Sequence, residues 1–129
     1  MHDAEVPDPD VLLAVWNRAC EYAGTGVGDR HLSALLLVDG TVQNGGPNHA
    51  ADGCEPAELA AAAAAARYFG VEDLAAVIEE LPAAASGYEE KAIEMRLMQE
   101  YLDVLQDYGP LEAGIAARHA AAPGDFDPV

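Results

Sequence analysis

The chain is predicted to fold as an all-α protein, a single compact bundle of five to six helices. Apolar residues recur along most of it at the three- and four-residue spacing that gives a helix one buried face. No stretch combines alternating apolar and polar residues with a hairpin turn, so no strand is expected. With 129 residues and 51% apolar composition, the chain can bury one core. Residues 1–129 are therefore expected to form one domain, with loose ends at about 1–7 and 123–129.

The first two helices are expected on either side of a glycine-rich connector, residues 24–28. The first begins at Pro9, because Asp8 can cap it and proline suits the first helical position. The second follows Asp29 as its cap and is expected to lie centrally, since it is apolar on more than one side. Gly40 within it predicts fraying or a close backbone approach, because glycine disfavours a helix interior.

The turn formed by Asn44, Gly45, Gly46 and Pro47 is expected to end this second helix. Asparagine and glycine accept the left-handed conformation of a helix C-cap, and proline cannot continue the hydrogen-bond ladder. A polar connector over residues 48–54 is expected to follow. The turn is interpreted as a fixed corner that directs the chain away from the helix.

Four further segments are predicted from start and stop signals. Glu55 and Pro56 begin an alanine-rich helix that Gly70 closes, and alanine has the highest helix propensity. A short helix over residues 71–81 ends at Pro82. A capping box at residues 86–89 starts a long helix over 88–108, and residues 109–110 break it before a last helix. The long helix has a predicted core stripe of Ile93, Leu97, Met98, Tyr101, Leu102, Leu105 and Tyr108.

The charge balance is the most informative part of the composition. The chain has 23 acidic and six basic residues, a formal net charge of -17. Such a field repels nucleic acid and anionic membranes and speeds encounter with basic partners, more so at low salt. Direct binding to nucleic acid or to a membrane is therefore not expected. The alternative interpretation is that the acidity reflects solubility or a salt-adapted proteome, with no specific partner.

The cysteines and the N-terminal residues indicate a cytoplasmic protein. Cys20 and Cys54 are too few for a disulfide framework and form no C-x-x-C motif, so reduced thiols are expected. The acidic N-terminus lacks the basic and apolar regions of a signal peptide. No apolar run approaches the roughly 20 residues that span a bilayer.

Three segments resemble a known family. Residues 36–46 form an apolar helix running into an Asn-Gly-Gly turn, and a small-residue helix then ends in Tyr68-Phe69-Gly70-Val71. A closing run contains Tyr101, Leu102, Leu105, Tyr108, His119, Asp125 and Phe126. Across roughly residues 10–127, this order resembles a family of small, mostly uncharacterised bacterial helical domains that includes a DNA mimic. The resemblance implies an all-α fold and a homodimer.

Acidic residues at helical spacing form the candidate binding surface. Glu100, Asp103 and Asp107 are three or four residues apart, which places carboxylates about 5–6 Å from one another, comparable to successive phosphates. Glu90 and Glu94 form a shorter stripe. Acidic residues of neighbouring elements could add to them: Glu55, Glu58, Glu72, Asp73, Glu79 and Glu80. The alternative is a solvated helix face without a partner.

These observations predict a non-enzymatic acidic module that binds a basic protein. In its DNA-mimic form the module would occupy the nucleic-acid site of a DNA-binding protein. An immunity-type inhibitor of a cationic toxin would use the same electrostatics, and an uncharacterised structural or regulatory protein is a further alternative. No cofactor is expected.

Metal binding is the weakest alternative. His49, Asp52, Cys54 and Glu55 place four potential ligands within seven residues, but the paired cysteines or histidines of zinc sites do not occur there. The chain also lacks a G-x-S-x-G motif, and residues 24–28 do not match a phosphate-binding loop. No catalytic residue and no metal ligand are assigned.

Overall fold

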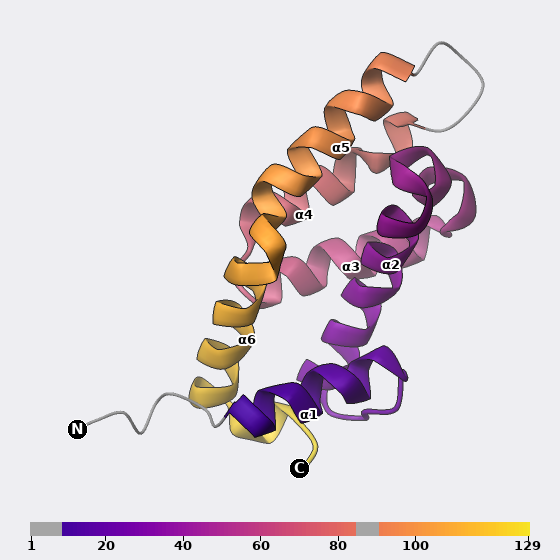
Figure 1. The fold of residues 1–129 in the computed structure, drawn as a ribbon. Coiled ribbons are helices and arrows are strands. Elements are labelled where there is room, and N and C mark those ends of the chain that lie inside the picture. The colour runs from indigo at the N-terminus through magenta and orange to yellow at the C-terminus, as the bar shows by residue number, and fades with distance from the viewer. Residues whose placement is uncertain (1–8, 85–90) are drawn as a thin grey trace.

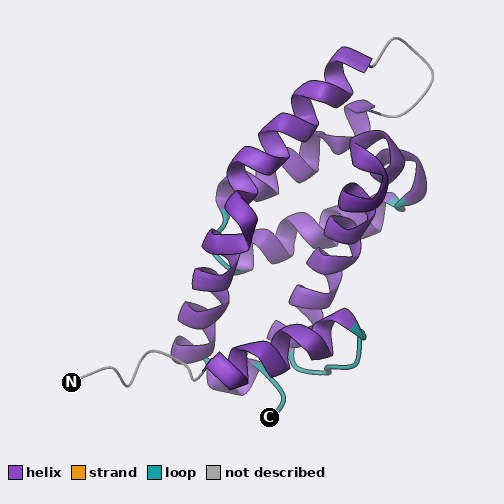
Figure 2. Ribbon diagram, viewed as in Figure 1, coloured by secondary structure: helices purple, strands orange, loops and turns teal. Residues whose placement is uncertain are grey.

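A computed structural model describes residues 9–84 and 91–129, and these residues form α-helices and short 3-10 turns without a strand (Figures 1 and 2). The predicted all-α bundle is confirmed. The α-helices are α1 (Pro9–Cys20), α2 (Val27–Gly53), α3 (Pro56–Tyr68), α4 (Glu72–Glu80), α5 (Lys91–Leu105) and α6 (Gly109–Ala121). The 3-10 turns are η2 (Leu81–Ala84), η3 (Gln106–Tyr108) and η4 (Pro123–Asp125).

Helix α2 is the central element, and α1, α3, α5 and η2 all pack against it. Figure 1 shows α5 and α6 following one another along one side of the molecule, with α2 along the other and α1 across one end. Helix α4 packs against both α3 and α5. Within the described ranges, no helix combines the length and apolar character needed to cross a membrane.

The core follows the predicted apolar faces. Helix α2 contributes Leu32, Leu35, Val38 and Val42, which are all fully buried. The alanine-rich helix α3 buries Ala62, Ala63, Ala65 and Ala66, because small side chains allow neighbouring backbones to approach closely. Helix α4 buries Leu74, Val77 and Ile78, and Leu81 at the start of η2 is buried beside them.

Helix α2 does not end at the predicted turn. The backbone leaves helical geometry only at Gly46 (φ 85°, ψ 178°), and the helix resumes at Pro47 and continues to Gly53. The predicted polar connector over residues 48–54 is therefore wrong. Proline at the start of the resumed segment needs no hydrogen bond for its nitrogen. The Asn48 N–H donates to the Glu94 carboxylate at 3.3 Å, so a contact from α5 completes the kink.

The start and middle of α2 also differ from the expectation. Gly26 is the N-cap, so Asp29 lies inside the first turn and is fully buried instead of capping the helix. Gly40 is exposed and helical, and no atom lies within 4 Å of where its Cβ would be. Neither fraying nor a close backbone approach occurs at Gly40, so that prediction was wrong.

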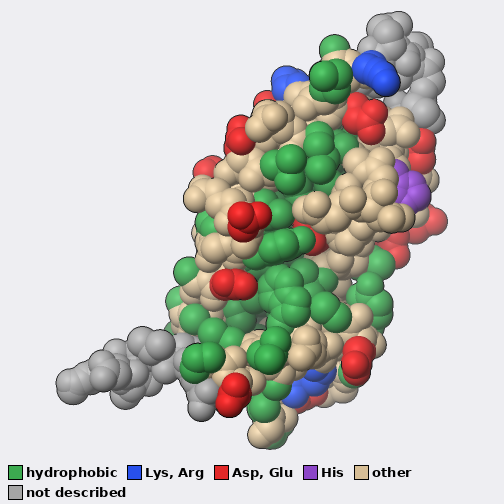
Figure 3. All heavy atoms as spheres, viewed as in Figure 1, with side chains coloured by type: hydrophobic (Ala, Val, Ile, Leu, Met, Phe, Trp, Pro, Cys, Tyr) green, Lys and Arg blue, Asp and Glu red, His purple; other side chains and the backbone are tan. Residues whose placement is uncertain are grey.

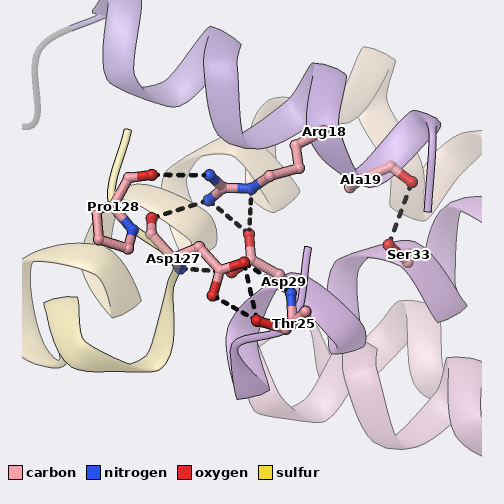
Figure 4. Close-up of polar contacts among 7 residues, drawn as sticks. All are labelled: Arg18, Ala19, Thr25, Asp29, Ser33, Asp127 and Pro128. Atoms are coloured by element: carbon pink, nitrogen blue, oxygen red, sulfur yellow. Dashed lines mark hydrogen bonds and ion pairs between the residues drawn. The ribbon is translucent and has the colours of Figure 1, made fainter. Parts of the chain in front are cut away.

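The C-terminal segment 123–129, predicted to be loose, is docked on the α1–α2 end of the molecule (Figure 4). Phe126 is 5% exposed. Arg18 donates to the carbonyl oxygens of Asp127 at 3.0 Å and Pro128 at 3.2 Å. The Asp127 carboxylate accepts hydrogen bonds from the Thr25 N–H at 2.8 Å and the Thr25 hydroxyl at 2.9 Å. Phe126 is the single aromatic residue of this segment, which gave too little signal in the sequence.

The glycine-rich connector makes this docking possible. A Cβ at Gly28 would collide with the Phe126 ring, and one at Gly26 would collide with the Asp125 carbonyl. The glycines therefore leave room for the C-terminal segment as well as joining two helices.

The exposure of individual side chains tests several smaller predictions. Leu97, Tyr101 and Leu105 of the predicted α5 stripe are buried, but Leu102 is 44% exposed and lies off the core face. Cys20 is exposed, whereas Cys54 is buried, and both thiols are free. The capping box at residues 86–89 and the predicted loose N-terminus, residues 1–7, lie outside the described ranges.

Two glycine substitutions in α2 are expected to have opposite effects. Gly46→Ala should lower the free energy of unfolding by about 1–2 kcal/mol, because an L-residue is strained at positive φ. Gly40→Ala should raise it by roughly 0.5–1 kcal/mol, because alanine favours an exposed helix and reduces the entropy of the unfolded chain. Urea unfolding of both variants measures the two changes. Equal effects of the two substitutions would contradict the kink at Gly46.

Candidate acidic interface

Carboxylates from α4 and α5 meet at a polar groove of about 410 Å³. Glu72 and Asp73 stand in the first turn of α4, where negative charge also stabilises the helix dipole. Asp103 stands near the C-terminal end of α5. The groove is lined by Gly70, Val71, Glu72, Asp73, Asp103, Val104, Gln106 and Pro110. The structure thus brings Asp103 together with acidic residues that lie 30 positions earlier in the chain.

Two arginines order the other carboxylates of this region. Arg67 donates to Glu79 at 2.6 Å and 2.9 Å and to Glu72 at 3.2 Å. Arg96 lies 2.9 Å from the Glu100 carboxylate and 3.6 Å from that of Glu80. The Arg67 hydrogen bond lowers the pKa of Glu79, and the Glu100 hydrogen bond raises the pKa of Arg96. All these groups are exposed, so water and salt screen the pairs and they add little stability.

We define the acidic face as these carboxylates of α4 and α5. Its members are Glu72, Asp73, Glu79, Glu80, Glu100 and Asp103. In the ion pairs of the described residues, Arg67 and Arg96 are the only cations that pair with members of this face. The face therefore keeps an excess of negative charge. Asp103 accepts a hydrogen bond from the Gln99 amide at 2.9 Å, which fixes the carboxylate without neutralising it.

The predicted α5 stripe is only partly retained. Glu100 and Asp103 belong to α5, but α5 ends at Leu105, and Asp107 (φ 55°) lies in η3. The helical spacing from Asp103 to Asp107 was therefore a wrong prediction. Glu94 is half-buried and turned toward α2, where it accepts the Asn48 N–H. Glu90 lies outside the described residues.

The C-terminal end of α5 is held by a buried carboxylate that the sequence pattern did not indicate as important. Asp39 of α2 is 6% exposed and accepts hydrogen bonds from the Tyr101 and Tyr108 hydroxyls, both at 2.6 Å. Burial, together with the bond to Asp39 and its negative charge, raises the pKa of both tyrosines. The signal in the sequence was an aspartate between Leu35 and Val42, at the spacing of the apolar face of α2.

A second buried carboxylate joins α1, α2 and the C-terminal segment (Figure 4). Asp29 is fully buried and pairs with Arg18, whose Nη2 lies 2.7 Å away. It also accepts the Asp127 N–H at 2.6 Å. A buried ion pair stabilises a fold only where further hydrogen bonds satisfy both charges, and the contacts of Arg18 and Asp29 with the C-terminal segment meet that condition.

A third polar cluster surrounds Tyr68 and is closed to solvent on several sides. The ring of His31 stacks on Tyr68 with 4.3 Å between centroids, and the Arg118 guanidinium lies 4.1 Å from the same ring centre. The Tyr68 hydroxyl donates to Asp125. Burial, and then the charge of Arg118, lower the pKa of His31. His31 is half-buried, because Tyr68 covers one side of its ring.

The cluster weighed as a metal site is not assembled. His49, Asp52 and Glu55 are exposed, whereas Cys54 is buried at the C-terminal end of α2. In the described part of the chain, no three His, Cys, Asp or Glu side chains converge as metal ligands would.

The tyrosine clusters predict loss of stability in alkali. Because folding raises the pKa of Tyr101 and Tyr108 above the ordinary value near 10, their contribution is fully present below pH 10. This stabilising contribution is lost as the pH rises above about 10, because the tyrosines of the unfolded chain then lose their hydroxyl protons while those of the folded chain still hold them. Urea midpoints measured between about pH 8 and pH 11 should fall above pH 10. The fall should be smaller in Tyr108→Phe, whereas Tyr22→Phe, at an exposed tyrosine outside the clusters, is the matched control. A midpoint independent of pH in this range would contradict the prediction.

Comparison with family models finds no match, and comparisons with curated proteins and with solved structures find none either.

Proposed function

We propose that this chain is a non-enzymatic acidic module that binds a basic protein through the acidic face. The supporting observation is that only two guanidinium groups pair with four carboxylates of α4 and α5, while Asp73 and Asp103 line a groove with Glu72 and form no ion pair among the described residues. Two packed helices provide the face, so the carboxylates stand on rigid elements. Lysine and arginine side chains of a partner would neutralise the remaining negative charge of these carboxylates.

The distribution of cations supports the same proposal. Arg18 pairs with buried Asp29, and Arg118 donates to the Tyr68 carbonyl at 2.8 Å and 3.1 Å. These two guanidinium groups are used within the fold. The net charge of -17 would steer a basic partner toward the molecule and raise the association rate at low salt.

The DNA-mimic form of the proposal places the acidic face in the nucleic-acid site of the partner. Glu100 and Asp103 are adjacent on α5, and Asp73 lines the same groove as Asp103. A row of these carboxylates would contact the side chains of the partner that otherwise bind the phosphates of DNA. The resemblance to a family that includes a DNA mimic favours this form, and the homodimer implied by that resemblance is a separate prediction.

Affinity capture from the native cell, followed by titration with the captured basic protein, tests the proposal. Wild-type affinity should fall at least about tenfold between roughly 0.05 M and 0.3 M salt. The variant Asp73→Asn with Asp103→Asn should bind several-fold more weakly. The matched control is Glu21→Gln with Asp52→Asn, which removes the same charge at exposed positions that do not line the groove.

Two results would reject parts of the proposal. Affinity that is independent of salt, or equal loss in both double variants, would show that the acidic face is not the binding surface. Duplex DNA should compete with the module for a DNA-binding partner. A stable ternary complex of module, partner and DNA would exclude the DNA-mimic form alone.

A further inference from the structure

Helix α1 carries more apolar surface than the core covers. Val15 and Ala19 are fully buried, but Leu13 on another side of α1 is 58% exposed. Pro9, Leu12, Leu13 and Trp16 follow one another at spacings of one to three residues and share one wall of a groove. Leu12 and Trp16 of this wall also pack against the core, whereas Leu13 is turned further toward solvent.

Helix α6 forms the other wall of that groove through Glu112 and Ile115. The groove encloses about 470 Å³ and is lined by five apolar residues and one carboxylate. Figure 3 shows hydrophobic side chains gathered in a band along this face of the molecule, down to its lower end. An exposed apolar groove of this kind is typical of surfaces that bind another protein.

The charges in and around the groove indicate which kind of molecule it binds. Glu112 alone among the lining residues is charged, and among the described residues it belongs to no ion pair. A second copy of the chain would bring a further net charge of -17 to the contact. Like charges disfavour that association, whereas a lysine or arginine beside Glu112 would be attracted.

We propose that the α1–α6 groove binds an amphipathic helix of a partner protein, with apolar side chains in the groove and a basic residue at Glu112. Two helices with a groove between them suit a third helix, whose residues at i, i+3, i+4 and i+7 form one apolar row. This surface is separate from the acidic face, so it adds a second and mainly apolar binding site. Leu13 and Trp16 are its anchors, because they combine apolar area with partial exposure.

Trp16 also reports on the site, because it is the single tryptophan of the chain. Its ring is half-buried and contacts the edge of Tyr108, with 5.5 Å between centroids. A helix that enters the groove would remove water from Trp16 and shift its emission to shorter wavelength. Binding elsewhere would leave that emission unchanged.

The test titrates the full chain with a designed peptide of about 18 residues that contains leucine at i, i+3, i+4 and i+7, lysine at the positions that flank this leucine row, and no tryptophan. Wild-type protein should show a saturable blue shift of Trp16 emission. Leu13→Ser should weaken binding about tenfold or more, since a leucine contact is lost. Leu102→Ser, the same change at an exposed leucine outside the groove, should leave the affinity unchanged.

Two further comparisons separate charge from apolar contact. Glu112→Gln should weaken binding of the lysine peptide about two- to fivefold at low salt, and a peptide with glutamate in place of lysine should bind more weakly than the lysine peptide. The acidic-face variant Asp73→Asn with Asp103→Asn should retain the Trp16 response, so this test can succeed or fail independently of the proposed function.

Three outcomes would overturn the inference. The first is an unchanged Trp16 emission at saturating peptide, and the second is equal affinity of wild type and Leu13→Ser. The third is a wild-type dimer in sedimentation experiments that Leu13→Ser converts to a monomer, which would show that a second copy occupies the groove.

Discussion

The buried carboxylate of Asp39, which accepts the hydroxyls of Tyr101 and Tyr108, is the interaction on which both proposed surfaces depend. An ionised carboxylate in a core is costly unless strong hydrogen bonds replace water. The bond from Tyr108 fixes η3, where Gln106, Asp107 and Tyr108 all have positive φ (47°, 55° and 70°). Such residues are unfavourable by about 1–2 kcal/mol each. The bond thus sets the direction in which α6 leaves α5, and α6 forms one wall of the apolar groove.

The few cations of this acidic chain have two distinct structural uses. Arg18 holds Asp29 and the C-terminal segment, and Arg118 covers Tyr68, so these residues join elements that are far apart in sequence. Arg67 and Arg96 instead lie among exposed carboxylates and orient them. These two arginines therefore make partly buried contacts that hold distant segments together, while the chain keeps a strong negative charge. The apolar groove then adds contact area that charge alone would not provide.

Local signals in the sequence were sufficient where a helix start or stop depends on its own residues. The start of α3 at Pro56 and the buried face of α4 follow from a capping proline and apolar periodicity. The Asn-Gly-Gly-Pro pattern permits either a helix end or a kink, and the contact between Glu94 and Asn48 decides for the kink. The acidic stripe was only partly predicted, because the reversal at η3 depends on Tyr108 reaching Asp39 across 69 positions. Docking of Phe126 likewise depends on Gly28 and could not be inferred from the segment alone.

The most direct measurement is the unfolding free energy of Tyr101→Phe, Tyr108→Phe and the double variant in urea. Each hydroxyl donates to a charged acceptor, so each single substitution should cost about 1.5–3 kcal/mol. The double variant should lose more than the sum of the singles, because Asp39 would then keep neither phenolic donor. Single losses below about 0.5 kcal/mol that add in the double variant would contradict the central role of Asp39.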